Sequence, residues 1–145
     1  MPNFEEHNIQ ADKNISFLNL LQTSTDIYFD WKVTAAFYTS VHIINAHLAK
    51  TIDKHYQRHR DVEEALNPYN QLSVSKIDEE TYLSYKRLHN LSRRSRYLIH
   101  EDAKNRQEER PHYISENHFK KAKNRLQEII NYFENRYEVK YETVK

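Results

Sequence analysis

The feature that most constrains this chain is what it lacks: its 145 residues include no glycine. The tight turns of β-hairpins need residues with positive φ, a conformation that glycine adopts without steric cost. With no glycine and three prolines, a fold rich in β-sheet is disfavoured. Glycine is also needed where the backbone closely approaches a phosphate, so the P-loop and the dinucleotide-binding fingerprint are excluded.

The hydrophobic pattern instead predicts an all-α protein. The clearest helix is expected over about residues 30–51, where apolar side chains recur at steps of three and four. Its other side carries aromatic and small residues, so we expect a central helix with neighbours on two sides, and Trp31 and Tyr38 in the core. The apolar stripe consists of Val33, Phe37, Val41, Ile44, Leu48 and Ile52.

Four further helices are expected, at about residues 8–22, at 60–66, from Asp78 to at least Tyr97, and from Ser115 onward. Together they predict an up-down helical bundle of four long helices and one short helix. The chain shows no internal repeat or linker, so residues 1–145 are expected to form one domain. Residues 1–7 and 138–145 are expected to be frayed.

Charge and cysteine content narrow the possible functions. The formal net charge is +1, so any contact with nucleic acid has to be local. The chain contains no cysteine, which excludes disulfides, thiol catalysis and cysteine-bound zinc and fits a reducing cytosol. No signal-peptide pattern or membrane-spanning apolar run is seen, and we expect a cytoplasmic protein that does not associate with membranes.

Positive charge is most concentrated between Thr81 and His100, a stretch without any Asp or Glu. If the helix continues through His100, one stripe of basic side chains forms, and it lies nearly opposite Leu88, Leu91 and Leu98. This stripe is then expected to face water or a second copy of the chain. It consists of His89, Arg93, Arg96 and His100, extended by Tyr82 and Tyr85.

Two interpretations of this basic segment remain open. The first is a solvated face whose long side chains cover apolar surface and pair with acids from elsewhere. The second is an anion site, because guanidinium groups fit phosphate and tyrosines stack on bases. A histidine beside such arginines could move a proton on a ribose 2′-hydroxyl, which would suffice for metal-free RNA cleavage.

The sequence resembles the HEPN superfamily in the segment Asp30–Tyr38, in His42, in the histidine- and arginine-rich link at 54–60, and in Leu91–Tyr97. The resemblance implies a small helical bundle that forms a homodimer and uses no cofactor. Many members of this superfamily are metal-independent endoribonucleases of toxin–antitoxin or antiviral systems, and others are non-catalytic. RNA and a cognate protein are the implied partners.

The superfamily's signature is an arginine followed after four to six residues by a histidine. Arg94 and His100 have five residues between them, and Arg93 and His100 have six, whereas Ser95 stands where the tightest spacing would place the arginine. The resemblance thus implies that His100 is the general acid and base and that Arg94 or Arg93 holds the scissile phosphate. Candidate anion-binding residues are Lys86, His89, Arg96 and Tyr97, and candidate polar helpers are His42, Asn45 and Asp53.

Two alternatives complete the prediction. His55 and His59 are four residues apart, a spacing that can chelate a metal on a helix, but no third ligand stands at a motif spacing. We therefore expect no metal. A non-catalytic helical dimer or protein-interaction module is the alternative to an RNA-binding protein or ribonuclease, and it predicts that changes on the Tyr82 and Tyr85 face disturb association. The anion site would also suit an antitoxin-like protein or a small-nucleotide sensor, which shares the site but not the cleavage chemistry.

Overall fold

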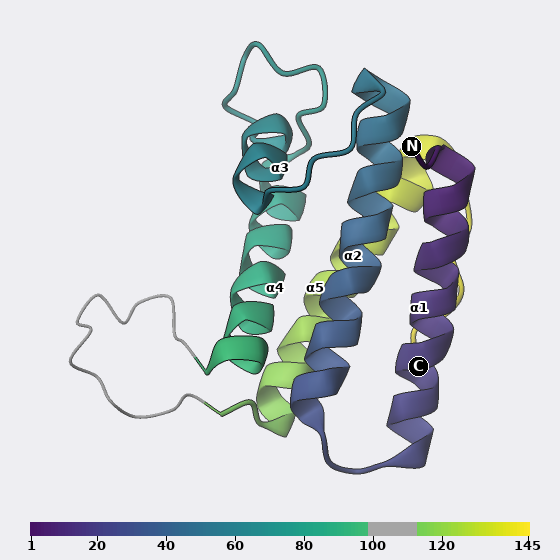
Figure 1. Ribbon diagram of the computed structural model, residues 1–145, viewed down its shortest axis with the longest axis vertical. Coiled ribbons are helices and arrows are strands. Elements are labelled where there is room, and N and C mark those ends of the chain that lie inside the picture. The colour runs from purple at the N-terminus through teal and green to yellow at the C-terminus, as the bar shows by residue number, and fades with distance from the viewer. Residues whose placement is uncertain (99–112) are drawn as a thin grey trace, which may run out of the picture.

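The computed structural model describes residues 1–98 and 113–145, and all regular secondary structure in these ranges is helical (Figure 1). The prediction of an all-α fold is confirmed. Within the described ranges, no helix has the length and apolar character needed to cross a membrane. The helices are α1 (Phe4–Ser24), α2 (Phe29–Ile52), α3 (His59–Leu66), α4 (Glu79–Tyr97) and α5 (Glu116–Tyr137).

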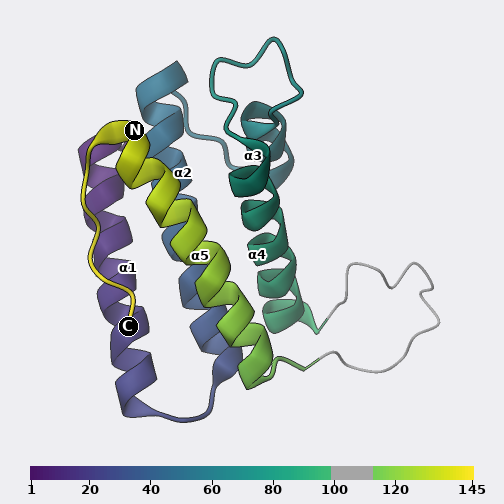
Figure 2. The same cartoon turned by 180° about the vertical axis from the view of Figure 1, so that it is seen from behind.

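The long helices run in alternating directions, and α2 lies at the centre of the bundle (Figure 1). It packs against α1 on one side and against α4 and α5 on the other, as its two-sided pattern predicted. The short helix α3 packs on α4, near the C-terminal end of α2 (Figures 1 and 2). This position of α3 matters for the site, because it covers a part of α4 that would otherwise face water.

The core forms where the apolar stripe of α2 meets its neighbours. Phe37, Leu48 and Leu88 are fully buried there. Burying each large apolar side chain contributes on the order of 2 kcal/mol, so this stripe accounts for much of the attraction between the helices. Other fully buried side chains of the core are Ile15 and Leu18 of α1 and Leu126, Ile129 and Phe133 of α5.

Helix ends show how a chain without glycine makes its turns. The α4 helix begins at a side-chain cap, in which the Asp78 carboxylate accepts a hydrogen bond from the Thr81 backbone N–H at 3.0 Å. Among the residues that the structure describes, four non-glycine residues at helix ends adopt left-handed backbone angles, each at a cost on the order of 1 kcal/mol. They are Tyr28, Asp53, Leu98 and Glu138, with φ values of 61°, 51°, 57° and 53°.

Both ends of the chain differ from the frayed segments expected at 1–7 and 138–145. At the N-terminus, Asn3 and Glu6 form a reciprocal capping box that starts α1 at Phe4. After α5 the tail turns back and runs along α1 (Figure 2). Tyr141 is 5% exposed, and its hydroxyl donates to the Asn8 side chain at 2.6 Å. The buried ring of Tyr141 therefore anchors the C-terminal tail to α1, although the polar composition of the tail predicted a frayed segment.

Candidate anion-binding site

The end of α4 sets the geometry of the basic segment. The helix ends at Tyr97, and Leu98 adopts a left-handed conformation, with its N–H donating to the Arg94 carbonyl at 2.8 Å. The helix therefore does not continue through His100 as the predicted stripe required. His100 lies outside the described residues, so its pairing with Arg94 or Arg93 stays a prediction.

The expectation that the Tyr85 and His89 side of α4 faces outward is wrong. Tyr85 is 1% exposed, and the His89 side chain is 12% exposed. The His89 ring stacks on Phe37 of α2, with centroids 5.2 Å apart and an angle of 16° between the rings. His59 of α3 covers it from another side, with centroids 4.3 Å apart. This burial could not be predicted from a helical wheel of α4, because it results from the packing of α3 against α4.

We use the name histidine–arginine cluster for His59, Glu63, His89, Arg93 and Arg96, which α3 and α4 bring together beside α2. His89 Nδ1 lies 3.4 Å from a Glu63 carboxylate oxygen. The electrostatic influence of Arg93 and Arg96 reaches both imidazoles. The cluster therefore places two cations near two imidazoles, and one of these imidazoles contacts a carboxylate.

Aromatic rings hold Arg96 in place. Its guanidinium lies 5.7 Å from the Phe37 ring centroid, 5.8 Å from Tyr38 and 5.1 Å from Tyr97. Its Nη1 also donates to the Tyr38 hydroxyl at 3.3 Å. Within residues 1–98 and 113–145, neither Arg93 nor Arg96 forms an ion pair with a carboxylate. Packing on rings keeps a guanidinium oriented while leaving its charge uncompensated.

Both imidazoles of the cluster are neutral near pH 7. Burial, with smaller contributions from the neighbouring His59, Arg93 and Arg96, lowers the pKa of His89 to about 4. Burial, Arg96 and Arg93 likewise lower the pKa of His59. Glu63 therefore accepts a hydrogen bond from a neutral ring and does not form a full ion pair. A neutral imidazole beside fixed cations can accept a proton from a hydroxyl group.

The remaining predicted residues lie in different surroundings. Arg93 and Tyr97 are exposed, and Arg94 is half-buried. Lys86 lies one helical turn before His89, and its ammonium group is 5.5 Å from the centroid of the Tyr82 ring. Of the predicted anion-binding and catalytic residues, Arg93 and Arg96 lie near His89 in the histidine–arginine cluster.

Two aromatic residues expected in the core are instead exposed. Trp31 is 62% exposed and Tyr38 is 40% exposed, whereas Phe37 is fully buried as predicted. The cause is that α1, α4 and α5 cover other sides of α2. Since Tyr97 is also 60% exposed, rings from two helices surround Arg96 on the surface.

A pocket of about 400 Å³ lies beside the cluster, between α2 and the segment leading into α3. His42 lines it, and its Nδ1 lies 3.2 Å from His7 Nδ1 of α1. Burial lowers the pKa of His42, with a further contribution from His55, so this candidate helper is neutral near pH 7. A second pocket of about 470 Å³, near the chain's N-terminus, shares His42 with the first.

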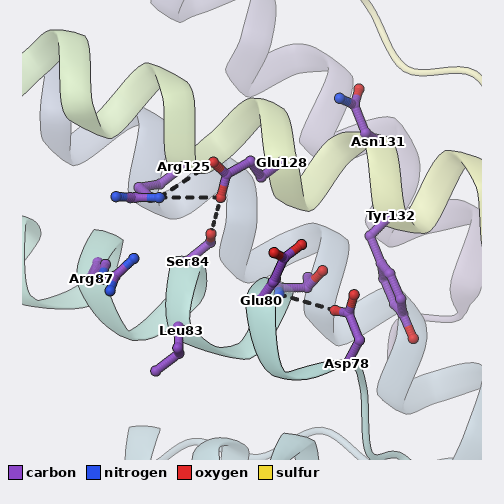
Figure 3. A pocket seen from close by; sticks show the side chains of 10 residues that line it. Asp78, Glu80, Leu83, Ser84, Arg87, Arg125, Glu128, Asn131 and Tyr132 are labelled. Atoms are coloured by element: carbon purple, nitrogen blue, oxygen red, sulfur yellow. Dashed lines mark hydrogen bonds and ion pairs between the residues drawn. The ribbon is translucent and has the colours of Figure 1, made fainter.

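The groove between α4 and α5, with a volume of about 600 Å³, differs in its charges (Figure 3). Glu128 accepts a hydrogen bond from Ser84 and pairs with Arg125 at 3.3 Å. Asp78 is occupied in capping α4. Because the residues that line this groove include three acids and two arginines, and Arg125 is paired with Glu128, the groove offers no excess of positive charge to an anion.

The two histidines that suggested a metal site are separated by structure. His55 lies in the segment between α2 and α3, and His59 begins α3, so they do not stand one turn apart on a helix. In the described parts of the chain, no three or more His, Asp or Glu side chains are arranged to hold a metal ion. Sequence reasoning considered His59 for metal binding only, and its place beside His89 and Arg96 depends on the packing of α3.

No protein-family model matches this chain, and neither the curated proteins nor the solved structures include a match.

Proposed function

We propose that this protein binds single-stranded RNA and is a HEPN-like bundle of four long helices and one short helix. The observation that carries this proposal is the set of surface aromatic rings around Arg96, next to Arg93. Guanidinium groups bind phosphate through fixed, directed N–H groups, and exposed tyrosine rings stack on unpaired bases. Tyr38 and Tyr97 supply such rings, at 40% and 60% exposure.

The binding experiment compares two double variants. Arg93→Ala with Arg96→Ala should weaken binding of a labelled single-stranded RNA by about tenfold or more, since each arginine–phosphate contact releases counterions. It should also make the dependence of log K on log salt shallower by about 1.4, or about 0.7 for each of two phosphates. The matched control is Arg87→Ala with Arg125→Ala in the α4/α5 groove. Equal losses in both variants, measured by fluorescence anisotropy, would contradict the proposal.

We also propose that the bound RNA is cleaved without a metal, as in the antiviral and toxin–antitoxin ribonucleases that the sequence resembles. The ribose 2′-oxygen attacks the adjacent phosphorus as its proton passes to a histidine. The bond from phosphorus to the 5′-oxygen of the next nucleotide breaks, and that oxygen takes a proton from the histidine or from water. The products are a 2′,3′-cyclic phosphate and a free 5′-hydroxyl. His100 is the proton carrier implied by the resemblance, and Arg94 or Arg93 stabilises the charge on the phosphate.

The cleavage experiment uses RNA of mixed sequence in a metal chelator. Wild-type protein should release fragments that end in cyclic phosphate, and His100→Ala should not. His59→Ala serves as a second variant, because His59 is a neutral imidazole beside Arg96. Absence of cleavage by the wild type, or equal cleavage by all three proteins, removes the enzymatic claim and leaves RNA binding to be judged on its own.

A non-catalytic dimer or protein-interaction module is the second candidate. Ile27 and Tyr28 are each 57% exposed, and with Trp31 they gather apolar area at the start of α2. The Tyr82 and Tyr85 face cannot serve this purpose, since Tyr85 is buried. Sedimentation of Trp31→Ala beside the control Leu72→Ala tests this candidate. A dimer that persists unchanged in Trp31→Ala would rule out this surface.

A further inference from the structure

Three histidines from separate segments meet beside α2, away from the histidine–arginine cluster. We call them the histidine trio: His7 of α1, His42 of α2 and His55 of the segment between α2 and α3. His7 Nδ1 lies 3.2 Å from His42 Nδ1. The ring of His55 stacks on the ring of His7, with centroids 5.5 Å apart and an angle of 10° between the planes. The trio therefore joins the first helix to two later parts of the chain.

The contact between His7 and His42 depends on their protonation. The two nitrogens that face each other are both Nδ1, so one of them must carry a hydrogen and the other a lone pair. One added proton can enter the Nε2 of the donor ring and leave this hydrogen bond intact. When both rings are charged, both Nδ1 atoms carry hydrogen, so the bond is lost and two cations repel each other at close range.

Charges near the trio do little to offset this repulsion. Burial, with smaller contributions from His42 and His55, lowers the pKa of His7 to about 4, and Glu6 acts in the opposite direction. Burial and His55 also lower the pKa of His42. The other titratable or charged residues that line the two pockets sharing His42 carry no carboxylate side chain. They are Met1, Tyr38, Tyr56, Arg58, His59 and Tyr85.

The first half of α1 relies on the trio for its attachment. Among the described helices, α2 is the one whose backbone packs closely against α1. The large apolar side chains that α1 buries, Ile15 and Leu18, lie in its second half. In the first half the buried side chains are His7 and Ala11. His7 is 2% exposed, and its Nε2 is buried without a hydrogen-bond partner in the described structure. An imidazole thus fills a place where an apolar side chain would pack without titrating.

We propose that the histidine trio is an acid-sensitive contact: when His7 and His42 are both protonated, they separate, and the first half of α1 detaches from α2. The inference does not depend on the proposed RNA binding, because the arginines assigned to RNA belong to α4. The sign follows from the direction of the shift. A ring that is hard to protonate when buried takes up its proton when exposed, so the detached form is favoured as the pH falls from 6.5 towards 4.

Hydrogen–deuterium exchange at pH 7 and pH 5, corrected for intrinsic exchange rates, tests this device. Exposure of His7 alone should favour the detached form at pH 5 by about tenfold or more. Amides in residues 4–13 should lose protection by that factor, and at pH 5 they should exchange faster than the amides of α2. Equal protection of α1 and α2 at pH 5 would mean that exchange occurs by global unfolding, and it would overturn the proposal. So would unchanged protection of residues 4–13.

A double variant tests whether the trio causes the loss. His7→Phe with His42→Phe keeps two packed rings that cannot titrate, so protection of residues 4–13 should be the same at both pH values. His118→Gln at the start of α5 is the control and should show the wild-type loss. If circular dichroism shows that the double variant does not fold, His7→Asn with His42→Asn replaces it, since paired amides hydrogen-bond without titrating. A loss as large as that of the wild type in the folded double variant contradicts the proposal.

Discussion

The histidine–arginine cluster and the α4/α5 groove lie on two sides of α4, and both contain arginines. In the groove, Arg125 is paired with Glu128, which also accepts a hydrogen bond from Ser84 (Figure 3). In the cluster, Arg96 is held by rings and a tyrosine hydroxyl, and no carboxylate of the described residues pairs with it.

This difference shows that the group that holds an arginine side chain determines whether its positive charge can still bind an anion. A carboxylate partner fixes the side chain but neutralises it. An aromatic face fixes it while leaving its N–H groups directed outward. The second arrangement is the one expected where an anion binds, and the first is the one expected where two helices are held together.

The largest expected effect comes from removing the ring beneath the cluster. Phe37 is fully buried and contacts both His89 and Arg96. Phe37→Ala should lower the free energy of unfolding by about 3–5 kcal/mol, the usual cost of deleting a buried aromatic side chain. Urea denaturation measures it, with Leu83→Ala at the half-buried groove as the milder control. A loss below about 1 kcal/mol would show that the cluster does not depend on this ring.

A smaller effect is expected from pH. The pKa of His89 falls from 6.5 to about 4 on folding. The unfolded chain therefore takes up this proton first, and the stabilisation present above pH 6.5 is lost as the pH falls towards 4. The loss amounts to up to about 3 kcal/mol for this histidine. Urea midpoints at pH 7 and pH 5 should differ less in His89→Phe than in the wild type.

The pH experiment also sharpens the comparison between the two regions. The α4/α5 groove contains no histidine among its lining residues. A variant of the groove should therefore keep the full pH dependence of the wild type. Four other histidines, whose pKa values burial also lowers, contribute to the dependence that remains in His89→Phe: His7, His42, His47 and His59. If His89→Phe retains all of the dependence, the burial of His89 contributes nothing to it.

The smallest effect is expected within the groove. Ser84 is 1% exposed and donates a hydrogen bond to Glu128, whose side chain is 48% exposed and can turn to water instead. Ser84→Ala should cost about 0.5–1.5 kcal/mol of stability, as measured by urea denaturation, and should leave RNA binding unchanged. Weaker RNA binding in this variant would show that the groove takes part in the site.

Much of the fold was predictable because helices leave a local signature. The stripe from Val33 to Ile52 predicted α2, and Asp78 and Ser115 marked the starts of α4 and α5. Periodicity shows that a helix has an apolar face, but it does not show how many neighbours cover the other faces. Trp31 lies on a side of α2 that remains exposed, although its composition suggested burial.

The site was less predictable because it depends on contacts between distant segments. The stretch from Thr81 to His100 stands out by its positive charge, but His59, which packs on His89 in this stretch, belongs to another helix. Tyr85 and His89 lie opposite the apolar stripe of α4, which indicated exposure, and only the packing of α3 and Phe37 buries them. Asn45 was one of three candidate helpers, and its unpaired oxygen is visible only in the folded chain.

The left-handed residues at helix ends have a consequence for the denatured chain. Tyr28, Asp53, Leu98 and Glu138 take positive φ where glycine would be unstrained. Each glycine replaced by a residue with a side chain removes about 0.4–1 kcal/mol of conformational freedom from the unfolded ensemble. The absence of glycine therefore affects both states. In the folded state, four helix ends of the described structure carry backbone strain. In the unfolded state, the chain has fewer conformations, so it loses less conformational entropy when it folds.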